Sequence, residues 1–98
     1  MIWSEKMIGS TPIQSEAAVR DVIRQVLAEM FGLTVTEVGD AFSMADEPAW
    51  DSLRHLTVIV TLEDQLGVNY TSQEIPQMSS LSELTRITTD HLGLPAEG

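Results

Sequence analysis

The residues best suited to chemistry stand together as Asp51, Ser52 and Leu53, at the point where a helical pattern begins. A serine in the first turn of a helix lies beside backbone N–H groups that have no partner within the helix, and beside the positive end of the helix dipole. Both features favour a negatively charged group such as a phosphate. A phosphate would therefore be stabilised beside Ser52. The alternative is that Ser52 only caps the helix.

A serine beside an aspartate is also found in some hydrolases, and here Asp90 and His91 would have to complete the catalytic triad. That reading needs oxyanion-hole residues and a sheet scaffold, and no strand pattern in the sequence supplies them. We interpret His91 instead as a charge near the negative end of a helix dipole, and Asp90 as solvated. His55 is expected to pack beside the core. We predict no catalytic residues and no metal site.

The helix that begins at Ser52 is predicted to end at Leu66, because Gly67 provides a left-handed stop. A turn of about 100° per residue places apolar side chains on two nearly opposite faces. The members of the first face are Val58, Ile59, Leu62 and Leu66, and those of the second are Leu53, Leu56 and Val60. One face suits the core, and the other suits an exposed surface for partners unless both are buried.

Two more helices and a short one are predicted around this helix. The first spans about 12–31, from a capping box at Thr11 to a stop at Gly32, and the last spans about 80–92. A capping box at Thr71 starts the short helix, which Pro76 ends within a turn or two.

A long loop over 33–51 joins the first helix to Ser52, and loops of this length are usually functional. We expect Val35, Val38 and Phe42 to anchor it to the core, and the segment 36–38 to form a single helical turn. The fold class is therefore all-α, a four-helix bundle of three main helices and a short third one. The domain spans 11–93, between a mobile leader at 1–10 and a fraying tail at 94–98.

Charge and composition restrict the partners. Asp and Glu number 15 against 5 Lys and Arg, which gives a net charge of −10. Such a field repels nucleic acid and anionic lipid and attracts basic protein surfaces, although solubility alone would also explain it. The chain has no cysteine, which excludes disulfides, thiolate catalysis and cysteine-ligated metals. With no signal-like start and no apolar run of roughly 18 residues, we expect a cytoplasmic protein without membrane insertion.

The segment Trp50-Asp51-Ser52-Leu53, together with Leu62-Glu63-Asp64-Gln65-Leu66-Gly67-Val68, resembles the acyl carrier protein family over about residues 12–92. The resemblance implies a carrier without catalytic activity. It implies that a phosphopantetheinyl transferase, which holds its own magnesium ion, attaches 4'-phosphopantetheine from coenzyme A to Ser52, with Asp51 and Leu53 beside it. The arm ends in a thiol, which holds the acyl group as a thioester.

The resemblance also implies partners: an acyl-loading enzyme and a downstream acyltransferase or ketosynthase, which dock on a monomeric carrier. The expected docking residues are Arg54, Leu56, Thr57, Val60 and Glu63. Many fatty-acid carriers are acidic at the positions of Arg54 and Thr57, and the paired glycines of peptidyl carriers are missing. These departures favour a specialised, polyketide-type pathway, with a fatty-acid or aminoacyl carrier and an unmodified helical interaction module as alternatives.

Trp50 is a third departure, because many members of the family have a small residue there. We expect its ring to pack the long loop against the helix that begins at Ser52, since a large aromatic ring is usually buried. Its alternative role is to shape the entrance for the arm.

Overall fold

The computed structural model describes residues 15–94, which form three α-helices and three short 3-10 turns. The α-helices are α2 (Glu16–Phe31), α3 (Ser52–Leu66) and α4 (Leu81–Leu92). The 3-10 turns are η2 (Val35–Glu37), η3 (Met44–Asp46) and η4 (Ile75–Gln77). No strand forms within the described residues, so the predicted all-α fold is confirmed.

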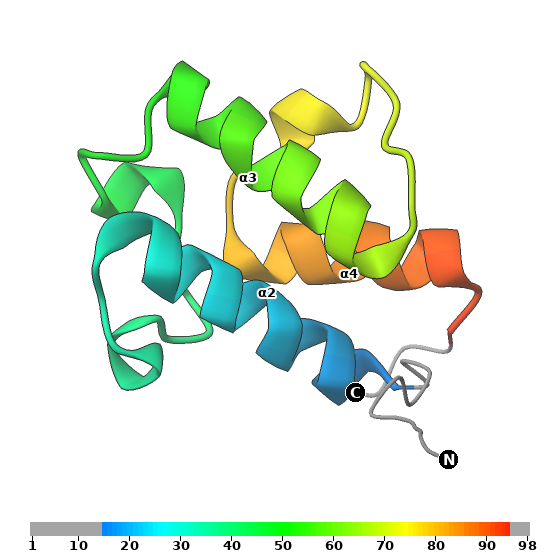
Figure 1. The fold of residues 1–98 in the computed structure, drawn as a ribbon, viewed down its shortest axis with the longest axis horizontal. Helices are drawn as coiled ribbons and strands as arrows, with labels where there is room; N and C mark the ends of the chain where they lie inside the picture. Colours follow the sequence, from blue (N-terminus) through cyan, green and yellow to red (C-terminus); the bar gives the residue numbers. More distant parts are fainter. Residues whose placement is uncertain (1–14, 95–98) are drawn as a thin grey trace, which may run out of the picture.

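The three α-helices surround one core, with α2 packed against both α3 and α4 (Figure 1). The connection from α2 to α3 carries η2 and η3, and η4 lies beside the first half of α3 (Figure 1). Backbone bonds tie this connection to the start of α4: Met44 N–H donates to Ser79 O at 2.9 Å, and Leu81 N–H donates to Phe42 O at 2.9 Å. The loop before Ser52 is thereby held to the helical body.

The first described helix begins later than its predicted start at residue 12. Ser15 is its N-cap, in an extended conformation, and its hydroxyl accepts a hydrogen bond from Ala18 N–H at 3.1 Å. An extended Ser15 cannot belong to a helix that starts earlier, so α2 starts at Glu16. The predicted capping box at Thr11 and the leader at 1–10 lie outside the described residues.

The predicted bounds of α3 are confirmed at both ends. Asp51 is the N-cap, and Gly67 ends the helix with φ 68°, in the left-handed region that favours glycine. The bounds of α4 also agree with prediction, because the hydroxyl of Ser80 accepts a hydrogen bond from Glu83 N–H at 3.1 Å.

The short third helix is a 3-10 turn rather than an α-helix. Its capping box forms as predicted: Glu74 N–H donates to Thr71 Oγ1 at 3.1 Å, and Thr71 N–H donates to Glu74 Oε1 at 2.9 Å. Only Ile75–Gln77 then follow, since Pro76 has no N–H with which to extend the hydrogen bonding.

The core is mostly aliphatic and confirms the predicted inner face of α3. Val58, Ile59 and Leu62 are buried there against residues of α2 and α4. Val38 is buried and Phe42 packs against the core, but Val35 is 46% exposed and does not anchor the loop as expected. The predicted helical turn near 36–38 is η2, which places Val35 at its first position and turns that side chain outward. None of the helices within 15–94 is long and apolar enough to cross a membrane.

Candidate functional site

Ser52 is exposed at the first position of α3. The capping role belongs to Asp51, whose Oδ1 accepts a hydrogen bond from Arg54 N–H at 2.9 Å. His55 N–H donates to Asp51 O at 2.8 Å. Within residues 15–94 no hydrogen bond engages the Ser52 hydroxyl, and the N–H groups of Ser52 and Leu53 keep no helical partner. A serine hydroxyl without a hydrogen bond and two backbone N–H groups without a helical partner therefore lie together at the start of α3.

Trp50 packs the loop that leads to Ser52. Its side chain is only 3% exposed, and its ring lies 5.8 Å from the ring of Phe42 and 5.6 Å from that of Phe31, measured between centroids. Phe31 is the last residue of α2, so the cluster fixes the loop before Ser52 to that helix. The predicted burial of Trp50 is confirmed, and its ring contacts the helix that begins at Ser52 through His55, 5.9 Å away between centroids, but it also packs against α2, which was not predicted.

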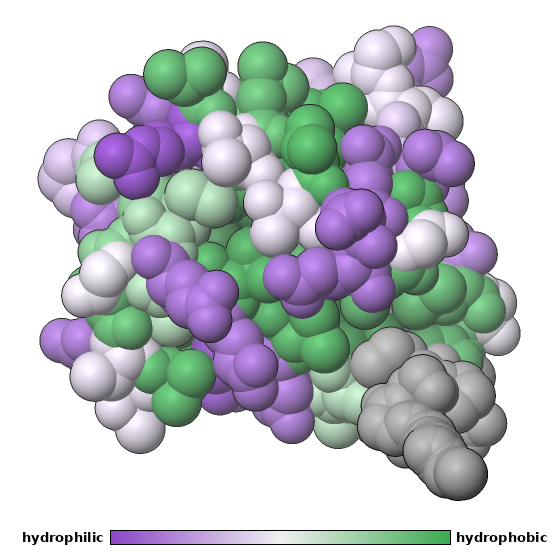
Figure 2. All heavy atoms as spheres, in the orientation of Figure 1, coloured by the Kyte–Doolittle hydropathy of each residue, from purple (hydrophilic) through white to green (hydrophobic). Residues whose placement is uncertain are grey.

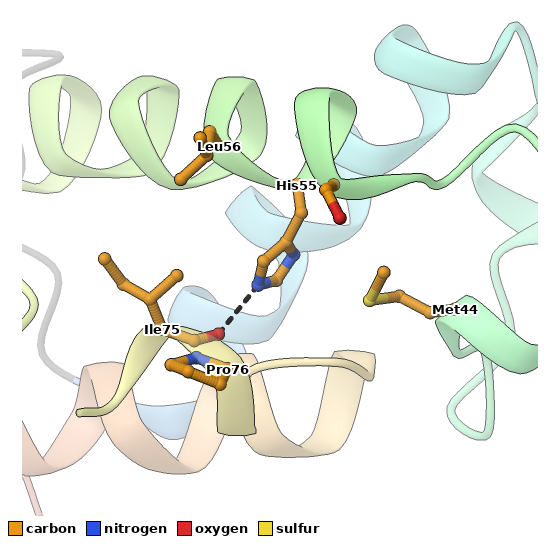
Figure 3. Close-up of a pocket in the computed structure, with 6 residues that line it drawn as sticks. Met44, His55, Leu56, Ile75 and Pro76 are labelled. Carbon is orange, nitrogen blue, oxygen red and sulfur yellow. Dashed lines mark hydrogen bonds between the residues drawn. The ribbon is translucent and has the colours of Figure 1, made fainter. Parts of the chain in front are cut away.

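His55 connects this loop to η4. Trp50 Nε1–H donates to His55 Nδ1 at 3.0 Å, and His55 Nε2 lies 2.7 Å from Ile75 O. The indole N–H can only donate, so Nδ1 carries no proton and the proton is on Nε2. Nε2–H therefore donates to the Ile75 carbonyl, as drawn in Figure 3. The side chain is 7% exposed, which agrees with the predicted place of His55 beside the core.

A cavity of about 320 Å³ opens beside Ser52, between the start of α3 and η4. The close-up shows His55 and Leu56 reaching from α3 toward Ile75 and Pro76, with Met44 on the other side (Figure 3). Most of this lining is apolar. At about 30 Å³ per water molecule, the cavity has the volume of roughly ten waters, which is enough for a chain several atoms long.

The second apolar face of α3 is exposed, as predicted. Leu53 is 73% exposed, Leu56 52% and Val60 62%, and Figure 2 shows apolar side chains gathered at the surface over α3. Thr57 lies on the same surface, and its Oγ1 donates to Leu53 O at 3.1 Å. The face begins next to Ser52 and continues for about two turns along the helix.

The two charged residues predicted for docking also bind within the chain. Arg54 Nη1 donates to Met30 O at 3.2 Å, near the carboxyl end of α2. Glu63 Oε2 accepts a hydrogen bond from Tyr70 N–H at 2.9 Å. Both side chains therefore hold a neighbouring segment in place, in addition to any contact with a partner.

The hydrolase alternative finds no geometric support. Neither Asp90 nor His91 lines the cavity beside Ser52. His91 Nε2 lies 2.7 Å from Glu74 Oε1, and its ring stands edge-on to the ring of Tyr70. The pKa of the Glu74 carboxyl is lowered mainly by the hydrogen bond from the Thr71 N–H, and further by the hydrogen bond with His91. No group of three or more His, Asp or Glu residues within 15–94 is placed to hold a metal ion.

Sequence reasoning missed that His55 belongs to the site, although a residue three positions after Ser52 returns to the same side of a helix. It also missed Met44, Ile75 and Pro76, which come from distant segments. No local pattern marks them.

No protein-family model matches this chain. The chain is, however, 30% identical over 74 residues to a protein named polyketide-8 synthase acyl carrier protein 2, from Streptomyces avermitilis. The match covers 76% of this chain and 85% of that relative. Because the similarity extends over most of both chains, and the described helices agree with the predicted all-α fold, the chain belongs to the acyl carrier protein family.

Proposed function

We propose that this protein carries an acyl group as a thioester on a 4'-phosphopantetheine arm attached to Ser52. The observation that carries the proposal is the place of the Ser52 hydroxyl, which is exposed, free of hydrogen bonds within residues 15–94, and at the mouth of an apolar cavity. Membership in the family implies the acyl carrier role and the prosthetic group. The choice of Ser52 as the attachment point is supported by its free hydroxyl and by the cavity beside it.

The residues around Ser52 fit a phosphodiester. The N–H groups of Ser52 and Leu53 are free donors at the positive end of the α3 dipole, which favours an anion. The Oδ1 of Asp51 accepts a hydrogen bond from the Arg54 N–H, and this bond offsets part of the carboxylate's negative charge within the turn. When attached, the prosthetic group supplies a thiol that forms the thioester, which the chain itself cannot supply because it has no cysteine.

The attachment reaction uses coenzyme A and a phosphopantetheinyl transferase. The Ser52 Oγ bonds to the phosphorus next to the pantetheine, the pyrophosphate link breaks, and adenosine bisphosphate leaves. A base of the transferase takes the serine proton. Ser52 needs to be accessible and held in one place for this step, and its position at the first turn of a rigid helix meets both needs.

The partner surface in this proposal is the exposed apolar face of α3. Leu53, Leu56 and Val60 would be covered by the transferase, by an acyl-loading enzyme and by a downstream acyltransferase or ketosynthase. The net charge of −10 attracts basic surfaces over long range, while the apolar face contributes the contact itself.

We further propose a polyketide-type pathway rather than fatty-acid synthesis. The relative named above belongs by its name to a polyketide synthase. In addition, Arg54 and Thr57 stand on α3 at positions where many fatty-acid carriers have acidic residues. A fatty-acid or aminoacyl carrier is the alternative. Loading by enzymes of the three classes separates them, and efficient charging by an aminoacyl-activating or a fatty-acid enzyme alone would refute the polyketide assignment.

Incubation with coenzyme A and a broad-specificity transferase tests the attachment. The intact mass of the full chain should rise by one phosphopantetheine, and Ser52→Ala should show no increase while its helical circular dichroism stays unchanged. Ser82→Ala is the matched control, because Ser82 is also an exposed serine in the first turn of a helix. Modification of Ser52→Ala, or loss of modification in Ser82→Ala, contradicts the assignment. An unmodified wild type would support the helical interaction module instead.

A further inference from the structure

The two histidines of this chain bind neighbouring residues of one short segment, from opposite sides. His55 of α3 binds the carbonyl of Ile75, and His91 of α4 binds the carboxylate of Glu74. Only the His55 contact lies at the cavity beside Ser52. The segment around η4 is therefore held to α3 and to α4 by separate side-chain contacts, which allows each to be removed alone.

The His55 contact continues to the loop before Ser52. Trp50 precedes Ser52 and His55 follows it, and the bond from Trp50 Nε1 to His55 Nδ1 closes a loop around Asp51 and Ser52. The second bond, from His55 Nε2 to Ile75 O, joins this loop to η4 across the cavity. One imidazole, that of His55, thus connects the backbone turn that presents Ser52 to Trp50 on one side and to η4 on the other.

Packing alone does not require this arrangement. An apolar ring at position 55 would fill similar space, but it would leave the buried indole N–H of Trp50 without an acceptor and would leave the Ile75 carbonyl with Met78 N–H, at 3.2 Å, as its remaining donor. Unlike apolar contact, the two hydrogen bonds fix the direction of both groups. Neutral imidazole, with one donor and one acceptor on a rigid ring, satisfies both at once.

We propose that His55 is a positioning residue for the modification of Ser52: by joining Trp50 to Ile75, it holds the Ser52 turn in the conformation that the transferase binds. This rests on the proposed attachment at Ser52. The bridge acts before the transferase binds, because it fixes the turn in the free protein. Its loss should therefore raise the KM for the carrier and leave kcat nearly unchanged.

Transferase kinetics on four full-length variants test the proposal. His55→Phe keeps a ring but breaks both bonds, and Trp50→Phe keeps a smaller aromatic ring and breaks only the bond to His55. Each should lower kcat/KM by at least about threefold, the loss expected for one net hydrogen bond, mostly through KM. His55→Gln should recover most of the rate, since its amide offers an acceptor and a donor on one planar group. His91→Phe, which breaks the other contact of the segment, should match wild type.

The tautomer gives a readout that does not depend on the transferase. Nitrogen-15 NMR of wild type at neutral pH should show His55 with its proton on Nε2, and the Trp50 indole N–H should exchange slowly with solvent. In His55→Phe this indole proton should exchange faster, whereas in His91→Phe it should not change. Helical circular dichroism of every variant checks that the domain is folded.

Four outcomes overturn the proposal. A proton on Nδ1 of His55 refutes the bridge itself. Wild-type KM in both His55→Phe and Trp50→Phe refutes its positioning role and leaves the proposed function intact, and an equal loss in His91→Phe assigns the effect to general loosening of η4. Failure of wild type to be modified refutes the proposed function, and this proposal with it. If His55→Phe does not fold, Trp50→Phe and His55→Gln decide the question.

Discussion

The two faces of α3 should respond to truncation in opposite ways. Leu62 is fully buried on the inner face, whereas Leu56 is 52% exposed on the outer face beside Ser52. Changing a buried leucine to alanine costs about 2–5 kcal/mol, from lost burial and the cavity left behind. Leu56→Ala leaves no closed cavity, and about half of a leucine's full burial value of roughly 1.5–3 kcal/mol is at stake, which gives about 1 kcal/mol.

Urea unfolding followed by circular dichroism measures this difference, and the rate of acyl transfer to a partner enzyme measures the functional effect. We expect Leu62→Ala to lower the free energy of unfolding by at least about 2 kcal/mol. We expect Leu56→Ala and Val60→Ala to change it by about 1 kcal/mol or less and to slow acyl transfer. Because a domain of this size has little stability in reserve, Ile59→Val is a milder core variant, with an expected cost of about 0.5–1.5 kcal/mol.

The reasoning is wrong if Leu56→Ala destabilises the protein as much as Leu62→Ala, because the outer face would then be part of the core. It is also wrong if Leu56→Ala and Val60→Ala both leave acyl transfer at the wild-type rate. In that case the exposed face would not be the partner surface.

Three further predictions concern charge and titration. With a net charge of −10, the protein repels itself, so its melting temperature should rise between low and moderate salt, and a flat response would contradict this. Burial raises the pKa of the Tyr70 hydroxyl, which also pairs with Thr88 at 2.6 Å. The raised pKa means that the contribution of Tyr70 to stability is complete below its ordinary pKa of about 10 and is lost as the pH rises above that value, so the alkaline loss of stability should be smaller in Tyr70→Phe. Finally, Arg54→Asp combined with Thr57→Glu should improve acceptance by a fatty-acid ketosynthase and impair the native loading enzyme, as measured by acyl transfer. Arg54→Gln, which lacks the charge but can still donate to Met30 O, controls for the loss of that bond, and a wild type that already matches a fatty-acid carrier would refute the charge argument.

Where local chemistry decides a boundary, the sequence predicted it well. The bounds of α3 follow from Asp51 at one end and Gly67 at the other, and the two faces of that helix follow from its own periodicity. Capping needs only residues a few positions apart, so no tertiary information was required. The same holds for the capping box at Thr71 and for the N-cap Ser80, whose hydroxyl accepts from Glu83 N–H without the reciprocal bond of a full capping box.

Predictions failed where several local signals compete. Thr11 and Ser15 are both capping residues, and Ser15 is the N-cap of the described helix α2. Val35 is as apolar as Val38, yet only Val38 is buried, because the path of the loop over the helices decides which side chain faces the core. Pro76 indicated a short helix after Thr71, but it did not indicate that the segment forms a 3-10 turn over Ile75–Gln77 instead of an α-helix. That choice depends on the contacts that hold the segment in place.

By itself, the sequence determined the all-α fold, the exposed serine at the start of a helix, and the apolar face beside it, because helix periodicity and capping are local properties of the chain. Only the tertiary structure decided what surrounds that serine. The cavity combines Met44, His55 and Ile75 from three separate segments, and the tautomer of His55 is set by Trp50 on one side and by η4 on the other. Contacts between distant segments depend on how the helices pack, and no spacing within one segment encodes them.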